Sequence, residues 1–194
     1  MTDYPDPGRR SIRLRGFDYA SNAVYFVTLC SSDRRCLFGD VVDGLMILNP
    51  IGQLIEREWL NSALIRVELD LHSFVVMPNH LHGLLTVTPA ESDRSADDGK
   101  DALRASGACH APLRREPRSL GSLVTGFKSA TTRQFRLMTG ETGSLWQRGF
   151  YEHVVRDERD FARIGGYIAN NPANWALDQE NIDSLVPKPV RSHQ

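Results

Sequence analysis

The chain has 194 residues, of which 41% are hydrophobic and 24% are charged, proportions typical of one soluble domain. Its longest apolar run, residues 23–27, is far shorter than the roughly 18 residues that cross a bilayer, and residues 1–10 contain no signal-peptide core, so we expect no membrane partner. The 3 cysteines form no C-x-x-C pair, which disfavours a disulfide framework and favours a reducing, cytoplasmic location.

Charge is distributed unevenly along the chain. The formal net charge is only −1, so a nucleic-acid partner would have to be held by local basic patches. The first such patch, in residues 9–15 (RRSIRLR), has no acidic residue and lies in a predicted basic N-terminal arm, residues 1–22. Its basic side chains are Arg9, Arg10, Arg13 and Arg15.

The ordered elements are expected within residues 23–182. Residues 88–118 lack hydrophobic periodicity and are rich in Ala, Ser, Asp, Gly and Pro, which predicts a disordered insertion. A flexible tail is expected at residues 183–194. β-branched, aromatic and helical periodicities predict, in chain order, a strand at 24–30, a helix at 47–60, strands at 69–77 and 81–87, a helix capped by Ser119, a strand at 153–156, and a helix from Asp157 to before Pro172.

This order of elements, βαββαβ followed by a helix, predicts an α+β fold. The expected core is ferredoxin-like, an antiparallel sheet with helices on one face, plus a C-terminal helix. In the helix that follows Ser119, an apolar stripe leaves Lys128 and Arg136 at its side, where they would be solvated residues or phosphate contacts.

Two histidines stand out in the segment MPNHLHGLL, residues 77–85. On a strand, side chains alternate, so His80 and His82 project from the same face. Two imidazoles on one face can bind one metal ion. Spacing alone leaves a second interpretation open, a surface or hydrogen-bonded pair without a metal.

The last predicted helix carries Tyr167 and Asn171, four residues apart and therefore one above the other. A tyrosine hydroxyl is a nucleophile once positioned, and an amide oxygen is a ligand for Mg²⁺ or Mn²⁺. The competing interpretation makes Tyr167 a half-buried packing residue and Asn171 a helix cap before Pro172. Tyr151 is the alternative nucleophile, but it precedes a strand and has no ligand one helical turn away.

The segments RRSIRLRGFDYA, FVVMPNHLHGLL, LWQRGFYEHVVRDERDF and YIANNP occur in the order found in REP-associated tyrosine transposases. The chain resembles this family, which belongs to the single-tyrosine HUH transposases and nucleases. The resemblance places the HUH motif on His80 and His82, the nucleophile on Tyr167 and a third metal ligand on Asn171. Many relatives have Gln at this last position, so Asn171 departs from their pattern.

The resemblance implies metal-dependent nicking and strand transfer of single-stranded DNA at palindromic hairpins, through a 5′-phosphotyrosine intermediate. The cofactor would be Mg²⁺ or Mn²⁺, with Mn²⁺ better suited to imidazole ligands. The partner would be single-stranded or hairpin DNA, and a monomer is favoured over a dimer. The DNA-binding residues would be Arg9, Arg10, Arg13, Arg15, Lys128 and Arg136.

Two other functions compete with this one. A host-retained hairpin-binding protein that does not cleave would keep the fold and the basic arm, but it would have no chemical need for His80, His82 and Tyr167 together. A histidine-triad nucleotide hydrolase would need a third alternating histidine, where the sequence has Leu84.

Overall fold

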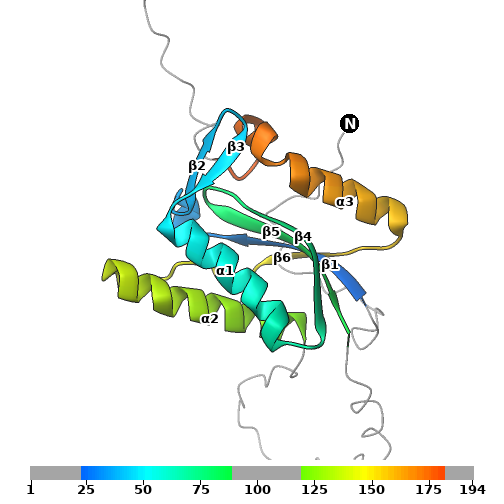
Figure 1. Cartoon of the computed structure of the whole chain (residues 1–194), viewed down its shortest axis with the longest axis horizontal. Helices are drawn as coiled ribbons and strands as arrows, with labels where there is room; N and C mark the ends of the chain where they lie inside the picture. Colours follow the sequence, from blue (N-terminus) through cyan, green and yellow to red (C-terminus); the bar gives the residue numbers. More distant parts are fainter. Residues whose placement is uncertain (1–22, 89–118, 182–194) are drawn as a thin grey trace, which may run out of the picture.

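The structure is a computed structural model that describes residues 23–88 and 119–181 (Figure 1). The predicted N-terminal arm with Arg9, Arg10, Arg13 and Arg15, nearly all of the predicted insertion at 88–118, and the predicted tail at 183–194 lie outside the described residues. Within the described part of the chain, no helix combines the length and apolarity needed to span a membrane.

The centre of the fold is a four-stranded antiparallel sheet with the order β4-β5-β1-β6. This sheet confirms the predicted α+β class. With the two helices that join them, its strands follow the predicted βαββαβ sequence. Their bounds are Ala23–Cys30 for β1, Leu69–Val76 for β4, His80–Val87 for β5 and Tyr151–Val154 for β6.

A hairpin between the first strand and the first helix was not predicted. It consists of β2, Gly39–Val42, and β3, Leu45–Leu48, and it forms its own two-stranded sheet. Ile47, which was predicted to begin a helix, lies in β3 instead. The helix α1, Pro50–Ile65, begins later because the Asn49 side chain accepts hydrogen bonds from the amides of Ile51 and Gly52.

The other helices begin where their caps predicted. Ser119 accepts a hydrogen bond from the Ser122 amide at the start of α2, Leu120–Thr139, and Asp157 caps α3, Glu158–Asn170, in the same way. The α2 stripe is buried except at Met138, which is 51% exposed. After α3 the chain continues in a 3-10 helix, η3, Pro172–Leu177.

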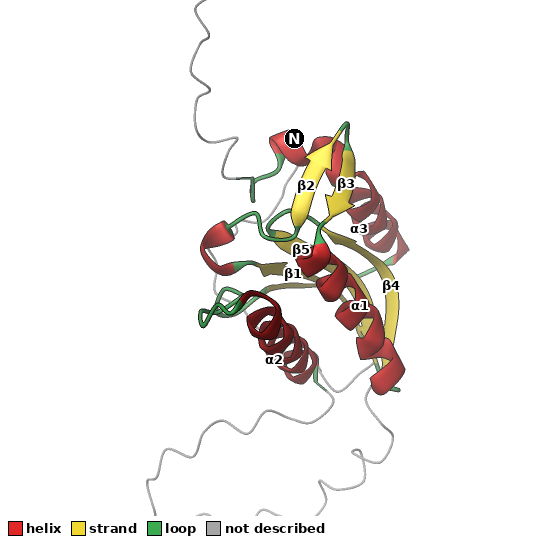
Figure 2. Ribbon diagram, turned by 60° about the vertical axis from the view of Figure 1, so that its left-hand side comes forward, coloured by secondary structure: helices red, strands yellow, loops and turns green. Residues whose placement is uncertain are grey.

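The helices cover both faces of the sheet (Figures 1 and 2). On one face α1 and α2 pack against odd-numbered residues of β1 and β5, with Trp59 and Phe127 in edge-to-face contact at 5.2 Å. On the other face α3 packs Ile164 and Ile168 against Phe26 and Leu84. Because strand residues alternate between faces, even-numbered residues of β5 lie beneath α3.

Gly83 of β5 provides a test of this packing. A Cβ added there would lie 2.4 Å from Cζ2 of the fully buried Trp59. We expect Gly83→Ala to lower the free energy of unfolding by about 1–3 kcal/mol, because the ring has no room to move. Urea unfolding measures it, with Gly166→Ala as the matched control. Gly166 lies in α3 with nothing within 4 Å of its added Cβ, so this change should stabilise by about 0.5–1 kcal/mol; equal effects of both substitutions would contradict the packing.

Candidate metal and nucleophile site

The two histidines of the sequence motif lie on the α3 face of β5, and both are fully buried. The antiparallel register pairs His80 with Cys30 and His82 with Thr28 of β1. Directly paired residues project to the same face of a sheet. The centroids of the two imidazole rings are 4.4 Å apart, so the motif forms one compact group on an ordered strand.

The tautomer of His80 follows from its neighbour Asn79. The Asn79 Nδ2 group donates to the backbone oxygens of Glu180 at 2.7 Å and of Arg34 at 3.1 Å, so its Oδ1 faces His80 as an acceptor. His80 Nδ1–H therefore donates to Asn79 Oδ1 at 2.8 Å, and the lone pair is on Nε2. Burial lowers the pKa of His80 to about 3, which keeps the ring neutral.

His82 is held between a strand neighbour and the last helix. Its Nδ1 lies 2.9 Å from Thr28 Oγ1, and its Nε2 lies 3.2 Å from the hydroxyl of Tyr167. Burial, followed by the proximity of His80, lowers the pKa of His82 well below its usual value. Both imidazoles are therefore neutral, the form in which a histidine coordinates a metal.

Tyr167 reaches this group from α3. Its ring packs edge-on against Phe26, with centroids 6.1 Å apart, and the ring is half-buried. Tyr151 packs against the same Phe26 at 6.3 Å. Since β6 pairs Tyr151 with Thr28, β1 lies between Tyr151 and the strand that carries His82. Of the tyrosines in the described residues, Tyr167 is the one whose hydroxyl lies within hydrogen-bonding distance of a motif histidine.

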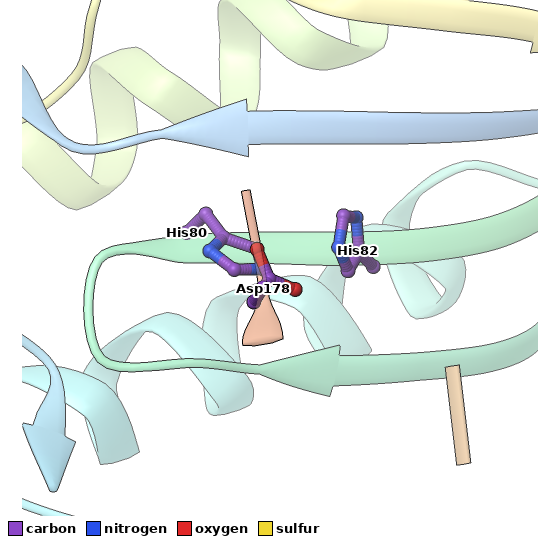
Figure 3. A group of neighbouring side chains, drawn as sticks. All are labelled: His80, His82 and Asp178. Atoms are coloured by element: carbon purple, nitrogen blue, oxygen red, sulfur yellow. The ribbon is translucent and has the colours of Figure 1, made fainter. Parts of the chain in front are cut away.

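A carboxylate that the sequence analysis missed completes the group. Asp178, directly after η3, brings an oxygen within 4.8 Å of ligand nitrogens of both His80 and His82 (Figure 3). The predicted third ligand, Asn171, is 2% exposed, and its Nδ2 donates to Asp178 Oδ2 at 3.0 Å. The structure thus brings Asn171 beside the group through Asp178.

The donors in this group suit a divalent cation. His80 Nε2 and Asn171 Oδ1 are buried without a hydrogen-bond partner among the described residues, which is costly unless an unseen group satisfies them. Two imidazole nitrogens with carboxylate and amide oxygens are a ligand set for Mn²⁺, Mg²⁺ or a similar ion. The residues present fit the divalent metal that the resemblance implied.

The predicted DNA contacts on α2 lie on the other side of the sheet. Lys128 Nζ donates to the backbone oxygens of Gln147 and Gly149, and burial lowers its pKa to about 8. Arg136 donates to the Gly143 oxygen. Both side chains line an open groove together with Arg133 and Arg148. They hold the loop before β6, and their contact with DNA stays a prediction.

Two residues of the site had weak sequence signals. Asp178 lies seven positions beyond Asn171, and only the reversal of the chain through η3 returns it to the histidines. Asn79 was interpreted as part of a turn. Its position next to the first histidine was the available signal, because metal-binding histidines commonly donate their second ring nitrogen to an oxygen acceptor.

Comparison with known proteins identifies a relative by sequence and a solved structure with a similar fold. No family model matches the chain. A protein of uncharacterised function from Haemophilus influenzae is 36% identical over 175 residues, covering 90% of this chain and 94% of that protein. A solved REP-associated tyrosine transposase bound to a REP hairpin is similar in structure, with a TM-score of 0.53 at 19% identity, over 88% of this chain and 77% of that one. This similarity shows a shared fold.

The metal site can be tested without DNA. We expect Mn²⁺ at 100 times its dissociation constant to stabilise the protein by about 2.7 kcal/mol, a rise in melting temperature of at least about 5 °C. His80→Gln should remove this rise, and His72→Gln, which changes an exposed histidine of β4 outside the group, should retain it. Differential scanning calorimetry with and without EDTA measures the shift; an equal rise in all three proteins would place the ion elsewhere.

Proposed function

We propose that this chain, which belongs to the same family as the Haemophilus influenzae protein and has the fold of a REP-associated tyrosine transposase, nicks and rejoins single-stranded DNA. Its substrate would be hairpin DNA of the palindromic kind. Its nucleophile would be Tyr167, and its cofactor would be Mn²⁺ or Mg²⁺ at His80, His82 and Asn171, together with Asp178.

One observation carries the proposal. The hydroxyl of Tyr167 lies 3.2 Å from Nε2 of His82, within a buried group of metal-ligand type. A packing tyrosine has no need to approach a histidine pair that is 0% exposed. A nucleophile must stand beside the ion that binds the same phosphate, and this arrangement meets that requirement.

In the proposed reaction, Tyr167 supplies the attacking oxygen and the metal-site residues hold the cation. A divalent cation, when bound, would polarise the scissile phosphodiester and offset its developing negative charge. The Tyr167 oxygen attacks phosphorus, a new P–O bond forms, and the bond to the 3′ oxygen breaks. The tyrosine proton is balanced by the proton that the 3′ hydroxyl gains. The product is a 5′-phosphotyrosine ester, and attack by a 3′ hydroxyl on this ester reverses the step and joins strands without ATP.

Single-stranded and hairpin DNA are the favoured substrates because the phosphodiester has to reach a hydroxyl on a half-buried tyrosine. We assign hairpin binding to Arg9, Arg10, Arg13 and Arg15 of the N-terminal arm, with Lys128 and Arg136 as further contacts. The solved structure of similar fold was bound to a REP hairpin, which supports a DNA partner of this class. A monomer holds all four proposed metal-site residues and Tyr167 in one chain.

Cleavage should require the metal and an unpaired strand. With Mn²⁺ or Mg²⁺, we expect the protein to cut single-stranded oligonucleotides that contain a hairpin and to leave fully paired duplex intact. Denaturing gel electrophoresis of end-labelled DNA measures both. EDTA should stop the reaction, and undiminished cutting in EDTA would refute the role given to the metal.

Substitution of the nucleophile separates cleavage from binding. Tyr167→Phe removes only the attacking oxygen, so we expect it to abolish strand cleavage and to change hairpin affinity little. Tyr151→Phe is the matched control and should cleave normally. Gel shifts measure binding and labelled DNA measures cleavage. Binding without cleavage by the unmodified protein, under every metal tested, would favour the hairpin-binding alternative.

A further inference from the structure

A small cluster of polar residues joins the metal site to the turn that follows η3. Glu180 in this turn is 8% exposed and pairs with Arg34 through a 3.2 Å contact between Oε2 and Nε. Its other neighbour is Cys30, whose thiol donates to Oε2 at 3.5 Å. Burial raises the pKa of Cys30 to about 12, so the thiol keeps its proton and remains a donor.

The same cluster reaches both sides of the proposed metal. Asn79 donates to the backbone oxygens of Glu180 and Arg34 and accepts from His80. On the other side, the Glu180 amide donates to Asp178 Oδ1 at 2.7 Å, while Asn171 donates to Asp178 Oδ2 at 3.0 Å. Each oxygen of the Asp178 carboxylate therefore has one donor that fixes its direction.

The cluster holds in place a turn that is far from the two histidines in the sequence. Asp178 is 98 residues from His80, and the turn that carries it has no strand or long helix to anchor it. The contacts that hold this turn include those of Glu180 with Arg34, Asn79 and Cys30, together with that of Asp178 with the Asn171 amide. Without them, ordering a free carboxylate over the histidines would cost backbone and side-chain entropy at the moment of metal binding.

We infer that Arg34 and Glu180 are positioning residues that hold Asp178 as a ligand and thereby set the metal affinity of the site. The inference rests on the proposed function, because it presupposes the divalent ion of that function. It assigns a role to two residues outside the proposed set of metal ligands. Outer residues of this kind typically change metal affinity by about 10-fold to 100-fold.

A substitution of Arg34 distinguishes a positioning role from a purely electrostatic effect on metal affinity. Arg34 is a cation near the site: its guanidinium contacts Glu180 at 3.2 Å, and its backbone oxygen accepts a hydrogen bond from Asn79, the neighbour of His80. If charge alone mattered, removing it would strengthen the binding of a divalent cation. If Arg34 positions the turn, removing it weakens the binding. The two explanations therefore predict opposite signs for one substitution.

The experiment is a titration of the full chain with MnCl₂ alone, by isothermal calorimetry without DNA. We expect Arg34→Met and Glu180→Gln each to weaken Mn²⁺ binding about tenfold or more. Glu141→Gln is the matched control, because Glu141 makes an exposed pair with the neighbouring Arg35 at 3.7 Å; it should leave the affinity within about twofold. Melting of the metal-free proteins verifies that each variant is folded.

A double substitution shows whether Glu180 acts through Asp178. In an Asp178→Ala background, Glu180→Gln should have no further effect on Mn²⁺ affinity, since the ligand it positions is gone. An unchanged or tighter affinity in Arg34→Met, or a full tenfold effect of Glu180→Gln in the Asp178→Ala background, would overturn the inference. These readouts need no cleavage, so loss of the positioning role and failure of the proposed DNA chemistry give different results.

Discussion

The pairing of β5 with β1 determines which side chains meet at the site. This register places Thr28 opposite His82 and Cys30 opposite His80, so the two histidines and the groups that support them share the α3 face. A shift of one residue would turn both imidazoles towards the Trp59 core. Gly83 follows His82 directly and faces the opposite side of the sheet, where only a hydrogen fits beside that ring. The packing of one face of the sheet therefore fixes the chemistry on the other.

Burial makes this group costly unless a metal is bound. Two neutral imidazoles lie 4.4 Å apart at 0% exposure, and the unpartnered acceptor atoms of His80 and Asn171 face no donor among the described residues. A protein that needed only a stable core would fill this space with apolar side chains. These buried polar atoms, together with Tyr167 and Asp178 beside them, form a preorganised group that could hold a metal ion with little rearrangement.

The strands and helix starts that depend on local residue patterns were predictable from the sequence. Period-2 and helical spacing gave the four strands of the sheet, and the caps Ser119 and Asp157 gave the starts of two helices. Ile47 was assigned to the wrong element because four apolar residues in a row fit a strand and a helix equally well, and the Asn49 cap decides between them. Asp178 was missed because its approach depends on a chain reversal through η3 and on contacts between residues about 100 or more apart.

The central claim is that Tyr167 is the group that bonds to DNA, and a mass spectrum of the covalent adduct tests it most directly. After reaction with a hairpin oligonucleotide in Mn²⁺ and digestion with trypsin and nuclease, the two candidate tyrosines fall in separate peptides, residues 149–156 and 164–191. The account predicts the 5′-phosphoryl nucleotide on the second peptide, at Tyr167. A modification on the first peptide, at Tyr151, would contradict it.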